Sequence, residues 1–233
     1  MCGRYRLSRR AEIFGKHFDV DDIDIDWDAR YNIAPAQHVP VIRKHSREGG
    51  RQASLLRWGL VPAWAKSPAI FELLINARSE TAALKPAFKE ALLRRRCLVP
   101  ADGFYEWQRI GQAKQPYCFG MCDDKLFAFA GLWERWEAGE AALESVTILT
   151  TSPNELMAGV HDRMPVILPS EAHDTWLDPG IKDIRTIHSL LKPYDAREMR
   201  RFAVSTHVNN VAHDDPLCSE PVEAKAPSQA SLF

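Results

Sequence analysis

The feature of this sequence that most constrains its fold is a series of short β-like runs in the middle of the chain, with no regular alternation of strand and helix. These runs lie at residues 39–43, 53–58, 97–99, 104–108, 117–121, 126–133 and 145–151. Because a doubly wound sheet needs regular strand–helix–strand units, this order favours an α+β fold. We therefore predict a curled, largely antiparallel β-sheet or barrel-like core with flanking helices. Pro40 marks the first run as an edge strand or a strand start.

The flanking helices are expected from capping residues, prolines and helical spacing of apolar residues. Residues 8–18 fit a first helix with Ser8 as its N-cap. In residues 79–96, Pro86 divides the helical pattern and suits the first position of a second helix. Later helices fit residues 155–158, 171–177 and 181–191.

Length and composition indicate one folded domain. The chain has 233 residues, and its hydrophobic content of 45% is ordinary for a protein with a real core. From residue 222 the composition turns to Ala, Pro, Ser and Gln, so we expect a single domain over residues 1–221 and a disordered tail over residues 222–233. The first residues carry charge, and no apolar stretch approaches the ~18–20 residues of a membrane span. We expect a cytoplasmic monomer that does not enter membranes.

Five cysteines and a net charge of −1 limit the chemistry and the partners. The cysteines are odd in number and irregularly spaced, which indicates reduced thiols. Cys118 and Cys122 are close in sequence, but no matching Cys or His pair follows, so we expect no metal and no other cofactor. With so small a net charge, any nucleic-acid site must be a local patch.

The Met-Cys start of the chain has a distinctive chemistry. A small second residue permits removal of Met1, which leaves Cys2 with a free α-amine beside its thiol. Their reference pKa values, ~7.7–8.0 for the amine and ~8.5 for the thiol, leave both groups partly deprotonated near neutral pH. The amine can attack an aldehyde, and the sulfur can then close a five-membered thiazolidine. The alternative is that Cys2 is simply the second encoded residue.

Five ordered motifs accompany this N-terminus. They are RYNIAP (30–35), WGLVPAW (58–64), INARSET (75–81), PADGFYEW (100–107) and GVHDRMPVIL (159–168). With these motifs and Met-Cys-Gly-Arg at its start, the chain resembles the SOS response-associated peptidase (SRAP) family of abasic-site-crosslinking proteins, from residue 1 to about residue 213. The resemblance implies a β-rich α+β domain whose cleft holds single-stranded DNA. It also implies that Cys2 forms a covalent thiazolidine crosslink with an abasic site and shields the lesion during replication.

The family's catalytic roles transfer to matched positions of this chain. The resemblance implies that Asn76 positions the nucleophile and the opened sugar, that Glu106 moves protons, and that His161 lies near the ring oxygen. These roles also fit the chemistry, because crosslinking needs the hemiacetal opened, water expelled and protons moved between nitrogen, sulfur and oxygen. The alternatives are an outward-facing Glu106 on an amphipathic strand and a loop His161 that pairs with Asp162.

The candidate DNA-binding residues are three arginines, a tryptophan and a threonine. Arg4, Arg78 and Arg163 are of the type that binds phosphate through two parallel hydrogen bonds, and the resemblance implies this role for Arg78. Trp64 offers a flat surface on which a base beside the lesion can stack. The resemblance places Thr150 in the lining of the pocket. The alternative is that these arginines are ordinary surface residues and that Trp64 belongs to the core.

Two other functions use the same residues. A thiol-dependent peptidase, or N-terminal-nucleophile hydrolase, would direct Cys2, Glu106 and His161 at an amide, with removal of Met1 as its minimal activity. A non-covalent single-stranded DNA-binding module would need only the basic and aromatic residues, and Cys2 would then be incidental.

The extreme C-terminus resembles a bacterial sliding-clamp-binding peptide of the Gln-Leu-Ser/Asp-Leu-Phe type. Leu232 and Phe233 would enter a hydrophobic groove while Gln229 forms hydrogen bonds at its rim. Ala230 departs from the usual leucine and should weaken binding, and the alternative is a chance pentapeptide. The predicted partners are therefore single-stranded DNA containing abasic sites and the replicative sliding clamp.

Overall fold

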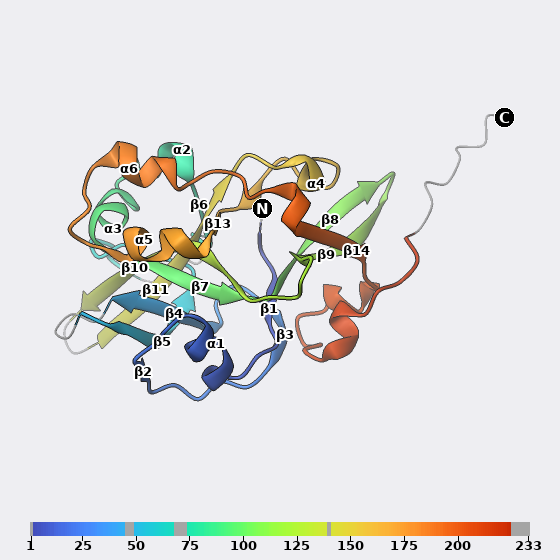
Figure 1. Ribbon diagram of the computed structural model, residues 1–233, viewed down its shortest axis with the longest axis horizontal. Helices are drawn as coiled ribbons and strands as arrows, with labels where there is room; N and C mark the ends of the chain where they lie inside the picture. The colour runs from blue at the N-terminus through green and yellow to red at the C-terminus, as the bar shows by residue number, and fades with distance from the viewer. Residues whose placement is uncertain (1, 45–48, 68–73, 139–140, 225–233) are drawn as a thin grey trace.

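The computed structural model describes residues 2–44, 49–67, 74–138 and 141–224. Within them, two β-sheets are flanked by short helices (Figure 1). The predicted α+β fold with a barrel-like core is confirmed. None of the described helices has the length and apolar character needed to cross a membrane.

Five strands close into a barrel. Four of its five contacts are antiparallel, in the order β11-β10-β7-β4-β5. The ring closes where β5 pairs in parallel with β11, with Arg57 opposite Ser145 and Trp58 opposite Val146. The five strands are β4 (His38–Lys44), β5 (Arg51–Trp58), β7 (Arg96–Ala101), β10 (Phe127–Ala138) and β11 (Ala141–Thr151).

A second, fully antiparallel sheet lies beside the barrel, in the order β14-β9-β8-β1-β3. Strand β8 follows barrel strand β7 after one residue, so the chain passes directly from one sheet to the other. The β8–β9 hairpin extends away from the barrel (Figure 1). The strands are β1 (Tyr5–Leu7), β3 (Arg30–Ile33), β8 (Gly103–Ile110), β9 (Ala113–Met121) and β14 (Met199–Ala203).

An aromatic cluster joins the two sheets. The Tyr5 ring on β1 packs edge-on against Trp58 of β5 at 5.3 Å and against Phe129 of β10 at 5.7 Å between ring centroids. Phe104 of β8 contacts the same Phe129 ring at 5.9 Å. All four side chains are fully buried, so each contributes about 1.5–3 kcal/mol of hydrophobic stabilisation. This cluster fixes β1, and with it the N-terminal segment, against the barrel wall.

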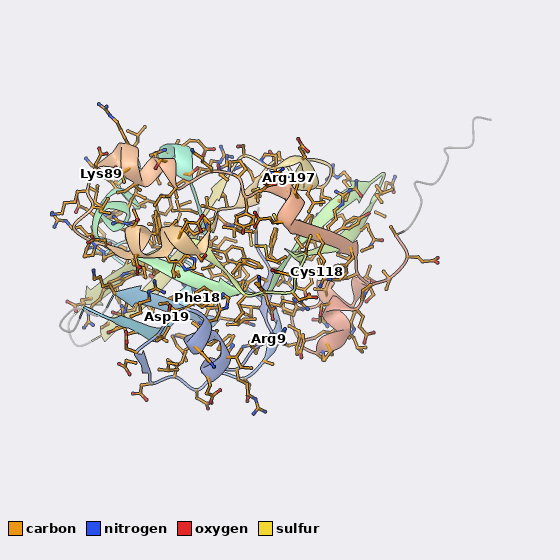
Figure 2. The ribbon with its side chains drawn as sticks, viewed as in Figure 1. Arg9, Phe18, Asp19, Lys89, Cys118 and Arg197 are labelled. Carbon is orange, nitrogen blue, oxygen red and sulfur yellow. The ribbon has the colours of Figure 1, made fainter. Side chains whose placement is uncertain are left out.

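Short strands and helices complete the fold. Strands β2 (Asp22–Ile23), β6 (Asn76–Arg78), β12 (Met164–Pro165) and β13 (Ile167–Leu168) add to the barrel sheet. The α-helices are α1 (Ala11–His17), α2 (Ser79–Ala82), α3 (Lys89–Arg94), α4 (Glu155–Ala158), α5 (His173–Leu177) and α6 (Ile184–Ser189). The 3-10 helices are η2 (Ser170–Ala172), η3 (Ala196–Glu198), η4 (Thr206–Asn209) and η5 (Pro216–Ser219). Phe18, labelled in Figure 2, follows α1 and packs against the His173 ring of α5.

The predicted helix starts need three corrections. The helix expected over residues 181–191 begins at Ile184, because the Asp183 side chain caps it there. Helix α1 begins at Ala11 with Arg10 at its N-cap, because Ser8 donates from both its backbone N–H and its hydroxyl to the Asp102 carboxylate. Pro86 is not the first residue of a helix, since α3 begins at Lys89.

Pro40 is also placed differently from the prediction. It is the third residue of β4, a strand inside the barrel, where it lies opposite Leu55 of β5. In the described part of the chain, β7 pairs with β4 only at Ile42. The missing N–H of Pro40 therefore interrupts no ladder on the β7 side, which is how the barrel tolerates a proline there.

Candidate functional site

Cys2 lies in the interior of the molecule, three residues before β1, and its side chain is fully buried. Asn76, the first residue of β6, donates a hydrogen bond from Nδ2 to the Cys2 carbonyl oxygen at 2.8 Å. Since β6 pairs in parallel with β11, this bond ties the N-terminal segment to the barrel sheet. The amide side chain is therefore in direct contact with the residue that it is predicted to position.

The other end of the Asn76 amide has a different environment. Its Oδ1 atom is buried and has no hydrogen-bond partner among the described residues. An unpaired buried acceptor costs about 1–3 kcal/mol, which a donor on an incoming group would recover. The Asn76 side chain therefore holds Cys2 with one atom and leaves the other free to accept a hydrogen bond from a hydroxyl or amine.

Glu106 lies on β8 with only 4% of its surface exposed. Strands β1 and β8 run antiparallel with Tyr5 opposite Phe104, and the Tyr105 N–H donates to the Arg4 carbonyl at 2.9 Å. This register brings the residues before Arg4 alongside Glu106. The alternative of an outward-facing Glu106 is therefore wrong.

The surroundings of the Cys2 thiol favour its protonated form. Burial raises the pKa of the thiol well above its ordinary value, and the neighbouring Glu106 carboxylate raises it further. The pKa of the Tyr5 hydroxyl is also raised, first by burial and then by Cys2. A reaction at this sulfur therefore needs a group that accepts the thiol proton as the new bond forms, and Glu106 is the adjacent carboxylate.

His161 lies in the loop after α4. Its backbone N–H donates to the Met157 carbonyl at 2.9 Å, and its Nδ1 lies 3.0 Å from the Arg163 backbone nitrogen and 2.8 Å from an Asp162 carboxylate oxygen. A neutral ring accepts the Arg163 N–H at Nδ1, whereas a protonated ring donates from Nδ1 to Asp162. Both protonation states of the imidazole therefore have a partner, as suits a residue that exchanges a proton.

The loop that carries His161 is tied to the strand that carries Glu106. The Gln108 side chain on β8 donates from Nε2 to the Gly159 carbonyl at 2.8 Å. Gln108 is two residues beyond Glu106, and Gly159 is two residues before His161. The proposed proton-transfer residues thus lie on segments that contact each other.

Arg163 and Thr150 form one cluster with Glu80. The Arg163 guanidinium makes two hydrogen bonds to the Glu80 carboxylate, at 2.6 and 2.9 Å, and also donates to the Thr150 carbonyl at 2.6 Å and its hydroxyl at 3.3 Å. The hydrogen bond from Arg163 lowers the pKa of Glu80. Arg163 is therefore already paired with a carboxylate, and a DNA phosphate would have to compete with it. This role of Glu80 was not predicted from the sequence, although Glu80 lies inside the INARSET motif.

Arg78 and Trp64 are the candidate DNA contacts that face solvent. Arg78 ends β6 and is exposed, and its side chain makes no hydrogen bond or ion pair within the described residues. Trp64 is 60% exposed, so the alternative that places it in the core is wrong. Its loop is held to the barrel, because the Trp136 indole donates to the Ala65 carbonyl at 2.7 Å. Both side chains thus project from anchored backbone.

Arg4 makes contacts within the protein. Its guanidinium donates to the Asn32 side chain at 2.8 Å and to the Val208 carbonyl at 2.9 Å, and it lies 5.8 Å from the centre of the Trp107 ring. Burial lowers its pKa. These contacts connect the start of β1 to β3 and to the C-terminal segment at Val208. Because its donors are already used, Arg4 has fewer of them available for a phosphate than Arg78 has.

Asn32 is a structural residue whose role the sequence did not reveal. It is fully buried, and its Nδ2 donates to the carbonyls of Val208 at 3.2 Å, Asn210 at 3.0 Å and His213 at 2.6 Å. Asp214 accepts the backbone N–H groups of Tyr31 and Asn32, and its carboxylate pairs with Arg30. The RYNIAP motif therefore fastens the segment 208–214 over β3.

The structure thus brings Cys2, Asn76 and Glu106 together, and it joins Thr150 to Arg163. The predicted clamp-binding residues Gln229, Leu232 and Phe233 lie outside the described residues. No described residues near Cys118 or Cys122 could hold a metal ion with them. Cys118, labelled in Figure 2, is a buried residue of β9, and Cys122 is exposed.

Comparison with known proteins defines the class to which this site belongs. The model of the family "SOS response associated peptidase (SRAP)" matches residues 1–211, and the chain belongs to this family.

Several relatives carry a more specific description. The abasic site processing protein YoqW of Bacillus subtilis (strain 168) is 41% identical over 220 residues, which cover 93% of this chain and 97% of that protein. The abasic site processing protein HMCES of Gallus gallus is 35% identical over 230 residues, which cover 85% of this chain and 68% of that protein. An X-ray crystal structure of a protein from Bacteroides thetaiotaomicron matches with a TM-score of 0.86 at 26% identity, over 95% of this chain and all of the other.

Proposed function

We propose that this protein processes abasic sites in single-stranded DNA by bonding its N-terminal cysteine covalently to the lesion. The observation that carries the proposal is the placement of Cys2, whose carbonyl is held by Asn76 and whose buried thiol is near enough to Glu106 to interact with its charge. The relatives named abasic site processing proteins support the choice of substrate.

The reaction begins with removal of Met1, which exposes the α-amine of Cys2. The amine attacks the aldehyde carbon of the opened sugar, and the carbinolamine loses water to give an imine. The thiol then adds across the C=N bond, so that sulfur bonds to carbon and a proton moves to nitrogen. From the free amine onward one water is released, and the product is a thiazolidine. The earlier hydrolysis of the Met1–Cys2 peptide bond consumes one water and releases methionine.

Each step needs a proton in a defined place. His161, which has a partner in either protonation state, would open the cyclic hemiacetal by protonating the ring oxygen. Glu106 would accept a proton from the amine, assist the departure of water and take the thiol proton during ring closure. Since the thiol pKa is raised by burial, attack by the amine comes first and attack by sulfur second.

The DNA strand would lie across the exposed residues around this cluster. Arg78 would bind a phosphate, and Trp64 would stack on a base beside the lesion. Arg4, Thr150 and Arg163 would line the pocket that receives the sugar and its phosphate. A local patch of this kind is compatible with the net charge of −1. The bonded protein would then shield the lesion during replication.

A thiol peptidase is less well supported by the same geometry. Such an enzyme needs a thiolate, which forms where a positive charge or a helix N-terminus lowers the pKa of the cysteine. Burial and Glu106 have the opposite effect on Cys2. The environment of Cys2 therefore suits a protonated thiol that closes a ring after the amine has reacted.

The decisive experiment is covalent capture. The protein is incubated with a single-stranded oligonucleotide that contains one abasic site, and a band that resists SDS and heat is sought. We expect the wild type and Cys122→Ser, a control for an exposed cysteine outside the site, to form the band. Cys2→Ala and a chain that retains Met1 should not form it. A heat-stable adduct in either of these proteins, or salt-sensitive binding alone in the wild type, would overturn the proposal.

We also propose that the C-terminal tail binds the replicative sliding clamp through Gln229, Leu232 and Phe233. Tethering to a clamp would raise the concentration of the protein near exposed single strands. A labelled peptide covering residues 224–233 should bind the clamp with micromolar affinity, as is typical of short disordered segments. The doubly substituted peptide Leu232→Ala, Phe233→Ala should not bind, and equal binding of the two peptides would end this proposal.

A further inference from the structure

Three potential metal ligands lie close together in the C-terminal segment, and none of them belongs to the candidate site around Cys2. They are His207 on η4, Asp215 at the N-cap of η5, and Cys218 on η5, and one donor atom from each lies within 4.8 Å of the others. Among the described residues, no other group of three or more His, Cys, Asp or Glu side chains could hold a metal ion. The segment lies beside β3 and below β9 (Figure 1).

The backbone holds Asp215 and Cys218 in fixed positions. One carboxylate oxygen of Asp215, Oδ1, accepts the Leu217 N–H at 2.9 Å and so caps η5. The Cys218 N–H donates to the Asp215 carbonyl at 3.1 Å. The Asp-x-x-Cys spacing therefore places both side chains on one turn, and the second carboxylate oxygen faces away from the cap.

The second carboxylate oxygen of Asp215, Oδ2, is within hydrogen-bonding distance of His207. Asp215 Oδ2 lies 3.1 Å from His207 Nε2. The His207 ring is stacked on His213, with 3.8 Å between ring centroids and 12° between planes, and His213 Nδ1 lies 2.8 Å from the His207 carbonyl oxygen. The imidazole is therefore held by packing with one ring nitrogen directed at the carboxylate.

The three ligands form a site that opens to solvent on one side. Cys218 is fully buried, whereas the side chains of His207 and Asp215 retain 27% and 44% of their exposure. An ion can therefore approach from solvent past the imidazole and the carboxylate and reach the sulfur beneath them.

We propose that His207, Asp215 and Cys218 bind a Zn²⁺ ion, with water in the fourth position. Sulfur, imidazole nitrogen and carboxylate oxygen are the ligands that Zn²⁺ takes in proteins, at about 2.3, 2.0–2.1 and 2.0–2.2 Å. Tetrahedral geometry with these bond lengths puts ligand atoms about 3.3–3.7 Å apart. His207 Nε2 and Asp215 Oδ2, now 3.1 Å apart, would separate slightly, and the Cys218 sulfur, within 4.8 Å of both ligands, would need a movement of at most about 1 Å. On binding, Zn²⁺ replaces the proton of the Cys218 thiol, and that proton passes to solvent.

Charge balance also favours a divalent ion. The thiolate and the carboxylate together carry two negative charges, so the loaded site is neutral. Arg4, which interacts electrostatically with Cys218, is then not repelled by the bound metal. The thiol now donates to the His213 carbonyl at 3.4 Å, and this weak contact is lost when the thiolate turns to the metal.

A metal at this position would stabilise the segment that holds the N-terminus. The backbone carbonyls of Val208 and His213 accept hydrogen bonds from the Asn32 side chain. The Val208 carbonyl also accepts a hydrogen bond from Arg4, which is two residues after Cys2 in the chain. Zn²⁺ would cross-link η4 to η5 and so fasten these acceptors over β3. At a free metal concentration of about 100 times Kd, the melting temperature should rise by about 5–10 °C.

The site is tested with Co²⁺, which takes the place of Zn²⁺ and absorbs light when bound to thiolate. Cys2→Ala protein is used, because an N-terminal aminothiol can itself chelate metal. We expect one equivalent of Co²⁺ to give a thiolate-to-cobalt charge-transfer band and the visible bands of a tetrahedral ion. Cys218→Ser on this background should lose the charge-transfer band, and Cys122→Ser should keep it.

A second variant protects the test against misfolding. Asp215→Asn keeps a residue that caps η5 but loses the charge, so the apo protein should melt near the parent temperature while Co²⁺ binding weakens by at least about 10-fold. Zn²⁺ should raise the melting temperature of the parent and not of Cys218→Ser. The proposal is overturned if the Cys2→Ala protein shows no thiolate band, if the band persists in Cys218→Ser, or if Asp215→Asn binds Co²⁺ as tightly as its parent.

Discussion

Replacing Glu80 by glutamine should make the protein bind single-stranded DNA more tightly. The Arg163 guanidinium is bonded twice to the Glu80 carboxylate, at 2.6 and 2.9 Å, in the protein without DNA. Arg163 can offer these donors to a phosphate only by giving up Glu80. The Glu80→Gln variant keeps the size of the side chain and removes the charge that holds Arg163.

The size of the effect follows from the exposure of the pair. The Arg163 side chain is 13% exposed and that of Glu80 is 51% exposed. A fully exposed ion pair contributes ~0.2–1 kcal/mol to stability, and a buried hydrogen bond to a charged group contributes ~1.5–3 kcal/mol. The contribution of the half-buried Glu80–Arg163 pair should lie between these ranges. A value of about 1 kcal/mol corresponds to an approximately fivefold lower Kd. Arg163 lowers the pKa of Glu80 below its ordinary 4.5, so the carboxylate is ionised and the effect present throughout pH 6–8.

The assay is fluorescence anisotropy with an undamaged single-stranded oligonucleotide at several salt concentrations. Loss of any negative charge strengthens DNA binding non-specifically, so the matched control is Glu90→Gln, which removes a carboxylate paired with Arg94 on α3. The salt dependence of Glu80→Gln should also steepen, by up to ~0.7 in log-log slope for one freed contact. Equal Kd values and slopes for the two variants would refute the idea that Arg163 contacts the DNA backbone.

Three further variants test separate parts of the site. Glu106→Gln should slow crosslinking by about 10² to 10⁴-fold in single-turnover gels and leave the affinity for undamaged strands unchanged. A crosslinking rate near that of the wild type would show that Glu106 does not transfer protons. Trp64→Ala should weaken single-strand binding by ~1–3 kcal/mol in anisotropy titrations without changing the melting temperature, because the indole is 60% exposed; unchanged affinity would exclude stacking. Asn32→Ala should lower the free energy of unfolding in urea by about 1–3 kcal/mol, since it removes a buried amide that donates to three backbone carbonyls; a loss below about 0.5 kcal/mol would contradict this account.

The strands of the barrel could be predicted from local sequence, but its closure could not. Residues 53–58 and 145–151 have the apolar, β-branched character of buried strands, and both are barrel strands. Their parallel pairing joins Arg57 to Ser145 and Trp58 to Val146, far apart in the chain. No local pattern specifies which distant edge a strand will meet, because register depends on the packing of the whole sheet.

Local capping rules failed where a tertiary partner was stronger. Ser8 has the sequence context of an N-cap, yet its hydroxyl and backbone N–H both donate to Asp102, whose carboxylate also lies 3.3 Å from Arg6. Leaving a buried carboxylate without these donors costs more free energy than leaving the helix without a serine N-cap. The helix therefore begins three residues later, at Ala11.

The chemistry-bearing residues of the site were accessible from the sequence, whereas their supports were not. Cys2, Asn76 and Glu106 are identified by residue type and motif, and the structure brings them together. Glu80 and Asn32 lie inside recognised motifs, but their roles depend on partners far away in the chain. The carboxylate of Glu80 meets Arg163, and the amide of Asn32 meets three backbone carbonyls of the C-terminal segment.

These supports hold the proposed nucleophile, which lies near a chain end, in a fixed position. Terminal residues are usually poorly ordered unless other parts of the protein hold them. Here Asn76 holds the Cys2 carbonyl from the barrel side, while Arg4, two residues later, is bonded to Asn32 and to the Val208 carbonyl. The N-terminal segment is thus held from both directions, by the barrel and by the C-terminal segment. Pre-positioning of this kind lowers the entropic cost of bringing an amine and a thiol to one carbon, as the proposed ring closure requires.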